Sequence, residues 1–173
     1  GMLPLGQSSG LAGILRTCAI LGETAMVDAC AEEVLRRLDR VEEPGLAKGL
    51  AGISLSLASV GLRSESTLTM QRALDMASDY SWKSNGLAHG RAGVIAAAAQ
   101  LFQSGDFPGL SNSLIAALLA EELSQVVVAD DHVSLRSEPD GNRVMPYLAS
   151  GSAGLLLSIV LLERSKIPIT LPH

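Results

Sequence analysis

His89 is the side chain of this sequence best placed to transfer a proton near neutral pH. It lies in the stretch NGLAHGRAGVIAAAA (residues 85–99), directly before an almost wholly apolar run. An imidazole can take or give a proton, bind a metal ion, or hydrogen-bond to backbone and shape a turn. The stretch predicts that His89 lies at the N-terminal end of a helix, where the helix dipole stabilises a developing anion. From the residues alone, an acid–base role and a structural role in the turn are equally open.

The stretch around His89 is one of four copies of a G-x-A-G motif. Each copy is followed closely by aliphatic residues, and the first three copies are spaced about 40 residues apart. The repeating units begin near residues 8, 46, 87 and 148. A period near 40 residues is typical of a helical repeat array or of a ring of helices. The first glycines of the four motifs are Gly10, Gly49, Gly90 and Gly151.

Each unit predicts a buried helix followed by a half-exposed helix. The run GVIAAAAQLF (93–102) is hydrophobic nearly all round, which is typical of a buried helix. The segment MVDACAEEVLRRL (26–38) instead has one apolar stripe with most charges off it. The glycines before the buried helices let backbones approach closely. We therefore predict an all-α fold, an α/α toroid-type array of about four helical hairpins that forms an incomplete ring.

The long interval before the fourth motif predicts a short β-hairpin inserted near residues 126–147. This interval is rich in β-branched residues and contains EPDG, a turn signal. After it we expect one inner helix and no outer partner. That helix would expose apolar side chains such as Leu155, Leu156 and Ile159. Because exposed apolar patches drive association, we predict a homodimer whose ends cover each other.

Composition narrows the class of protein. The chain has 173 residues, 47% of them hydrophobic but only 3% aromatic, which favours closely packed helices over a sheet. The length fits one domain, expected over residues 2–173, with Gly1 as a tag remnant. A net charge of −5 without a basic cluster argues against nucleic-acid binding, and no apolar run is long enough to span a membrane. We expect a cytoplasmic protein with reduced cysteines.

The motifs together resemble those of the lanthionine synthetase C-like family. Four G-x-A-G copies, the element AHG and the element PYLxxGSAG occur in the order that the family shows. The part from residue 85 to residue 162 is the most similar to the cyclase region of class III lanthipeptide synthetases, which are multidomain proteins with lyase, kinase and cyclase parts. The chain contains no kinase motif. The resemblance therefore implies a partial cyclase domain.

The resemblance also implies a reaction and its partners. In this family a ring of about seven helical hairpins binds a dehydrated precursor peptide, and cysteine thiols add to its dehydroalanine or dehydrobutyrine residues. The histidine of AHG, here His89, is associated with acid–base work. The lyase and kinase domains, in the same or an associated protein, are the other implied partners.

Metal binding is not expected, and no cofactor is predicted. Zinc-dependent relatives use a cysteine in a WCxG element, where this chain has Leu148 and Ala149, and a Cys-His pair that would fall beyond His173. The remaining candidate ligands do not converge on one site in the predicted fold. They are Cys18, Cys30 and His132.

Several further residues are candidates for contacts with a peptide. Lys48 takes the place of His89 in the preceding unit, Arg91 lies in the first turn after the motif glycine, and Tyr147 ends the insertion near Arg143. A surface lysine, a structural arginine and residues that close a hairpin are the alternative interpretations.

One expected acid is missing. The family's aspartate in an earlier repeat corresponds to Gly45 here, and the nearby Glu43 is interpreted as a solvated loop charge.

Three functions remain as hypotheses. The first is a zinc-independent lanthionine cyclase domain, inactive or incomplete as this part alone. The second is a non-catalytic peptide-binding or scaffold module of a multidomain kinase–cyclase protein. The third is an unrelated α/α-ring enzyme such as a glycosidase, which needs two opposed carboxylates that the motif loops do not offer.

Overall fold

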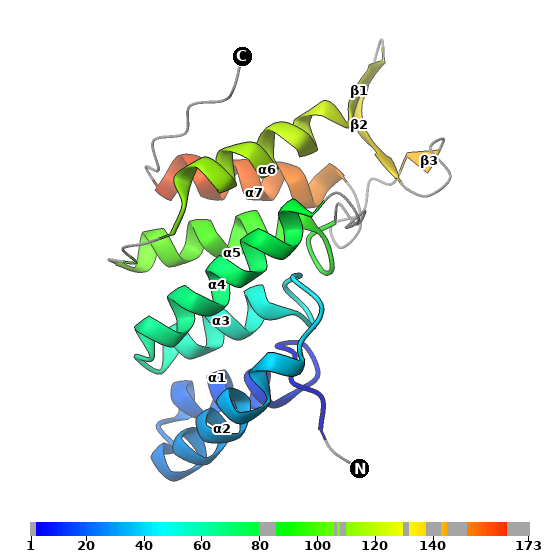
Figure 1. The fold of residues 1–173 in the computed structure, drawn as a ribbon. Coiled ribbons are helices and arrows are strands. Elements are labelled where there is room, and N and C mark those ends of the chain that lie inside the picture. The colour runs from blue at the N-terminus through cyan, green and yellow to red at the C-terminus, as the bar shows by residue number, and fades with distance from the viewer. Residues whose placement is uncertain are drawn as a thin grey trace.

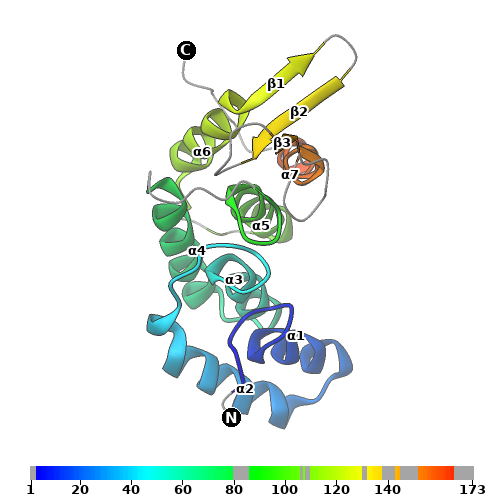
Figure 2. The same cartoon turned by 90° about the vertical axis from the view of Figure 1, so that its right-hand side faces the viewer.

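The chain folds into two layers of helices, as seen in a computed structural model that describes residues 3–79, 86–105, 107, 110–129, 132–137, 143–144 and 152–165. Inner helices α1, α3, α5 and α7 form one column, and outer helices α2, α4 and α6 form a second (Figures 1 and 2). Their bounds are α1 Leu11–Leu21, α2 Thr24–Arg37, η1 Leu38–Arg40 (a 3₁₀ turn), α3 Leu50–Ser59, α4 Arg63–Ser78, α5 Arg91–Ser104, α6 Asn112–Ser124 and α7 Ser152–Ser165. The all-α helical repeat predicted from the sequence is confirmed.

Burial follows the hydrophobic pattern of each helix. The first eight residues of α3, Leu50 to Leu57, are all buried, and α5 is buried from Arg91 to Ala99. In α2, by contrast, only four residues on one stripe are buried. Within the column, α3 packs on α1, α5 on α3, and α7 on α5. A helix with neighbours on several sides must be apolar all round, whereas a covering helix needs one apolar stripe.

Three short strands follow α6. Strands β1 (Val126–Ala129) and β2 (His132–Ser137) pair antiparallel, with Val126 opposite Leu135. Strand β3 (Arg143–Val144) pairs with the end of β2. The strands lie within the range 126–147, of which 130–131, 138–142 and 145–147 are outside the described residues.

The motif loops stack closely on one another at glycine residues, because glycine has no side chain to keep the two backbones apart. A Cβ built on Gly6 would lie 2.5 Å from the Cα of Lys48, and one on Gly45 would lie 2.7 Å from the Cα of His89. Backbone hydrogen bonds join the same loops: Ser8 N–H donates to the Ala47 carbonyl at 2.9 Å, and Ala47 N–H to the Ala88 carbonyl at 2.7 Å. The stack therefore carries Lys48 and His89 on successive loops at one end of the inner helices.

Each of the first two loops also satisfies the start of its own helix. Leu50 N–H donates to the Glu43 carbonyl at 2.8 Å, and Leu11 N–H donates to the Pro4 carbonyl at 2.9 Å. Neither Gly10 nor Gly49 has a side chain that could cap the helix. The loop backbone thus replaces a capping side chain and fixes the position of Glu43.

Replacing Gly45 with alanine is expected to destabilise the fold by about 2 kcal/mol or more, because the new methyl group would overlap backbone atoms of His89 that cannot rotate away. Gly61→Ala is the matched control. Gly61 has φ +82° but open space around its Cα, so only backbone strain of about 1 kcal/mol is expected. Urea unfolding measures both. A Gly45→Ala protein no less stable than Gly61→Ala would contradict the loop stack.

Candidate functional site

His89 faces a carboxylate from the preceding loop. Its Nδ1 lies 3.8 Å from Oε2 of Glu43, and both side chains are about half exposed, at 49% and 47%. No other polar partner contacts the imidazole in the described part of the chain. The contact depends on the stacking of Gly45 against His89, since Glu43 lies two residues before that glycine. Glu43 is about half exposed, in keeping with a solvated loop charge, and it also lies near His89.

This pair has the arrangement of a base with a supporting carboxylate. A carboxylate near one imidazole nitrogen can orient the ring and leaves the other nitrogen for a ligand. At 3.8 Å the distance from Nδ1 to Oε2 is longer than a hydrogen bond, and both side chains are about half exposed to solvent. The arrangement can take a proton from a bound group and hold it briefly.

An open pocket of about 590 Å³ adjoins the pair. Glu43 belongs both to its wall and to the contact with His89, and Lys48 lines it as an exposed cation. The pocket mixes charges of both signs with backbone from the first loop. Its lining residues include Ser9, Arg37, Arg40, Glu42, Glu43 and Lys48.

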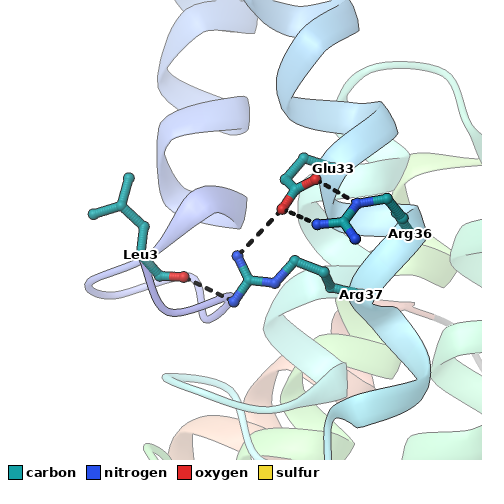
Figure 3. A network of polar contacts seen from close by, with 4 residues as sticks. All are labelled: Leu3, Glu33, Arg36 and Arg37. Atoms are coloured by element: carbon teal, nitrogen blue, oxygen red, sulfur yellow. Dashed lines mark hydrogen bonds and ion pairs between the residues drawn. The ribbon is translucent and has the colours of Figure 1, made fainter. Parts of the chain in front are cut away.

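A network of polar contacts lies around Arg37, one of the residues that line the pocket (Figure 3). Buried Arg37 donates from Nη2 to the Leu3 carbonyl at 2.9 Å, and its Nη1 lies 3.6 Å from Glu33. Arg36 binds the same carboxylate at 2.6 Å, and this hydrogen bond lowers the pKa of Glu33. The network ties the first motif loop to α2, so this side of the pocket is fixed in place.

Arg91 is in the interior. It is 5% exposed, its Nε donates to the Ala77 carbonyl at 2.9 Å, and its Nη1 lies 2.8 Å from Glu121. Because Ala77 lies in α4 and Glu121 in α6, the guanidinium joins α5 to two of the outer helices, α4 and α6. These contacts favour the structural interpretation of Arg91 over contact with a substrate.

Glu122 is a buried ionisable group that the sequence pattern did not single out. It is 0% exposed, and neither carboxylate oxygen has a hydrogen-bond partner in the described structure. Burial raises its pKa to about 8, the Glu121 charge adds to the rise, and the Arg91 charge opposes it. At neutral pH this carboxyl is therefore largely protonated.

Comparison with known proteins gives no assignment: no protein-family model matches this chain, and no curated protein is significantly similar to it. The resemblance to the lanthionine synthetase C-like family therefore stays an expectation from the sequence motifs.

The remaining candidates are spread over the chain. Tyr147, Leu148, Ala149 and His173 lie outside the described residues, and Arg143 and His132 lie in β3 and β2. Cys18 is partly exposed in α1, while Cys30 is buried in α2, where burial raises the pKa of its thiol. Among the described residues, no group of three His, Cys, Asp or Glu side chains could hold a metal ion. None of the described helices has the length and apolar character needed to cross a membrane.

Proposed function

We propose that the loop edge around His89 promotes the addition of a cysteine thiol to a dehydrated residue of a bound peptide. The observation that carries the proposal is the approach of Glu43 to His89, 3.8 Å across two stacked motif loops. The reaction class comes from the resemblance of the motifs to class III lanthionine cyclases.

The proposed chemistry balances without a cofactor. The imidazole takes the thiol proton, and the thiolate sulfur forms a bond to the β carbon of dehydroalanine or dehydrobutyrine. The electron pair of the C=C bond moves to the α carbon, which then receives a proton from the imidazolium. Glu43 stabilises the imidazolium between these two transfers. No oxidation or reduction occurs, and no group leaves.

The pocket, with Lys48 in its wall, is the proposed binding site for the peptide. The Lys48 ammonium is exposed in the pocket wall, where it can attract a peptide carbonyl or carboxylate. Tyr147 stays a predicted contact from the insertion. We further propose that the array is part of an α/α toroid with the β-hairpin as an insertion at its rim, and that lyase and kinase domains prepare the peptide. The cytoplasm remains the predicted compartment.

The proposal is tested by counting thiols. Cyclisation leaves the mass of a peptide unchanged, but it removes a thiol that N-ethylmaleimide would otherwise alkylate. A peptide with one dehydroalanine and one cysteine is incubated with the chain, quenched with the reagent and weighed by mass spectrometry. We expect the alkylatable fraction to fall several times faster with the chain than in buffer. Equal rates in both samples would reject catalysis.

A non-catalytic peptide-binding module is the second candidate function. It is favoured by Gly45, which stands where the resemblance places an aspartate, so the edge has fewer acids than a cyclase of this family. The discriminating result is saturable binding of the fluorescently labelled peptide together with unchanged thiol counts.

Glu43→Gln is expected to slow thiol addition by about tenfold while leaving peptide affinity within about twofold, because a supporting carboxylate typically contributes 10- to 100-fold. Glu32→Gln on α2 is the control, since it removes an exposed carboxylate away from the motif loops and should leave the rate unchanged. An equal loss of affinity and rate would instead indicate that Glu43 only shapes the pocket.

A further inference from the structure

The open side of α1 carries a groove of about 390 Å³. It lies between the first motif loop and helix α1, and both glycines of the first motif, Gly10 and Gly13, line it. Cys18 and Ile14 line its far end, where Ile14 is 38% exposed. The lining residues are Gln7, Ser8, Ser9, Gly10, Gly13, Ile14, Thr17 and Cys18.

The same place is filled in the next two units of the array. A Cβ on Gly52 would lie 2.9 Å from the Cβ of Gln7, which belongs to the preceding loop. A Cβ on Gly93 would likewise lie 3.1 Å from the Cβ of Leu46. At Gly13 the nearest atoms all belong to its own loop. The groove is thus the unfilled counterpart of two contacts that already join units within this chain.

Polar groups at the groove repeat the same pattern. Each loop gives a backbone N–H to the next loop, from Ser8 to Ala47 and from Ala47 to Ala88. The Ser8 carbonyl, which corresponds to these acceptors, accepts no such bond in the described part of the chain. The groove therefore offers a hydrogen-bond acceptor, the Ser8 carbonyl, as well as apolar surface.

The other end of the array has the complementary side. The Ser158 hydroxyl of α7 donates to the Ala92 carbonyl of α5 at 2.6 Å, so this helix position faces the preceding unit. Its counterpart in α1, four residues after the second motif glycine, is Thr17, which is exposed in the groove. On α7, three apolar side chains are exposed: Leu156 at 60%, Leu157 at 37% and Val160 at 41%. The expected exposure was wrong for Leu155 and Ile159, because Leu155 is 3% exposed in the core and Ile159 packs against that core.

We propose that this groove receives the α7 end of a second copy of the chain, so that copies associate head to tail. The contact would continue the column of inner helices from one molecule into the next. Because the two surfaces differ, the contact is heterologous, and it can grow beyond a dimer. This gives the predicted homodimer, in which ends cover each other, a heterologous contact that either closes a ring of copies or extends to further copies. The inference is independent of the chemistry proposed at His89.

Disulfide trapping tests the direction of association. Val160 is the counterpart of Ala19, so it stands at nearly the same height along α7 as Cys18 does along α1. Val160→Cys is made with Cys30→Ala, which leaves Cys18 as the only native thiol. After mild oxidation at tens of micromolar protein, we expect a ladder of dimers, trimers and larger species on a non-reducing gel. Adding Cys18→Ser should abolish the ladder.

Two results would overturn the proposal. Dimers alone that survive Cys18→Ser would show a symmetric contact between two α7 helices, and a lack of cross-linked species would show no contact. Sedimentation of the protein without added cysteines provides a second measurement. Thr17→Arg, which fills the groove, should lower the average mass toward that of a monomer. Leu68→Arg, at a 72% exposed position on α4, should leave it unchanged.

Discussion

Replacing His89 with alanine is expected to slow thiol addition by about 100-fold, and the peptide should still bind. The imidazole is the proposed carrier of the proton between the thiol and the α carbon, and a positioned acid–base group contributes about 10²–10⁴-fold. The half-exposed side chain makes few packing contacts, so its removal should leave the fold intact. Initial rates of thiol loss, measured by alkylation, give the effect.

Two controls separate chemistry from structure in this experiment. His132→Ala removes a histidine from β2 instead of a motif loop and should retain the full rate. Added free imidazole should partly restore the rate of His89→Ala by serving as a diffusible base. An undiminished rate in His89→Ala would remove this residue from the mechanism.

Glu122→Gln is expected to abolish a large pH dependence of stability. In the unfolded chain this carboxyl has an ordinary pKa near 4.5, whereas in the fold its pKa is raised to about 8. The folded state therefore holds a proton that the unfolded state has lost between these values, and stability falls as pH rises from about 4.5 through about 8. The loss is at most about 5 kcal/mol, and the Gln variant should lack it.

Urea unfolding at pH 5, 7 and 8.5 measures this difference. We expect the two proteins to have similar stabilities at pH 5 and the Gln variant to be more stable by a few kcal/mol at pH 8.5. Glu32→Gln, at an exposed position, should follow the wild type at every pH. Parallel curves for wild type and Glu122→Gln would mean that water or a cation reaches the carboxyl.

The sequence predicts the layered helices well because their signals are local. Apolar residues all round α3 and α5 and a single stripe on α2 distinguish inner from outer helices without knowledge of their neighbours. The motif glycines likewise predict close approach of backbones. The partner of each approach is not encoded locally, which is why the stacking of Gly45 on His89 was not foreseen.

The ionisable groups were harder to place. Glu43 and His89 meet through the stacking of two loops, which no spacing in the sequence reveals. Arg91 and Glu122 were nevertheless accessible from the pattern. Arg91 takes the position of buried Leu50 in the preceding unit, and Glu122 lies on the stripe of Ile115 and Leu118 in α6. These positions indicate burial for both side chains.

Photo-cross-linking of a bound peptide tests most directly the claim that the stacked motif loops are the functional surface. A dehydrated, cysteine-containing peptide that carries a benzoylphenylalanine is irradiated with the chain, and the attachment sites are mapped by mass spectrometry. We expect attachment at residues 40–49 and 86–90, which contain Glu43, Lys48 and His89, and competition by unlabelled peptide. Attachment confined to the outer faces of α2, α4 and α6 would contradict the claim.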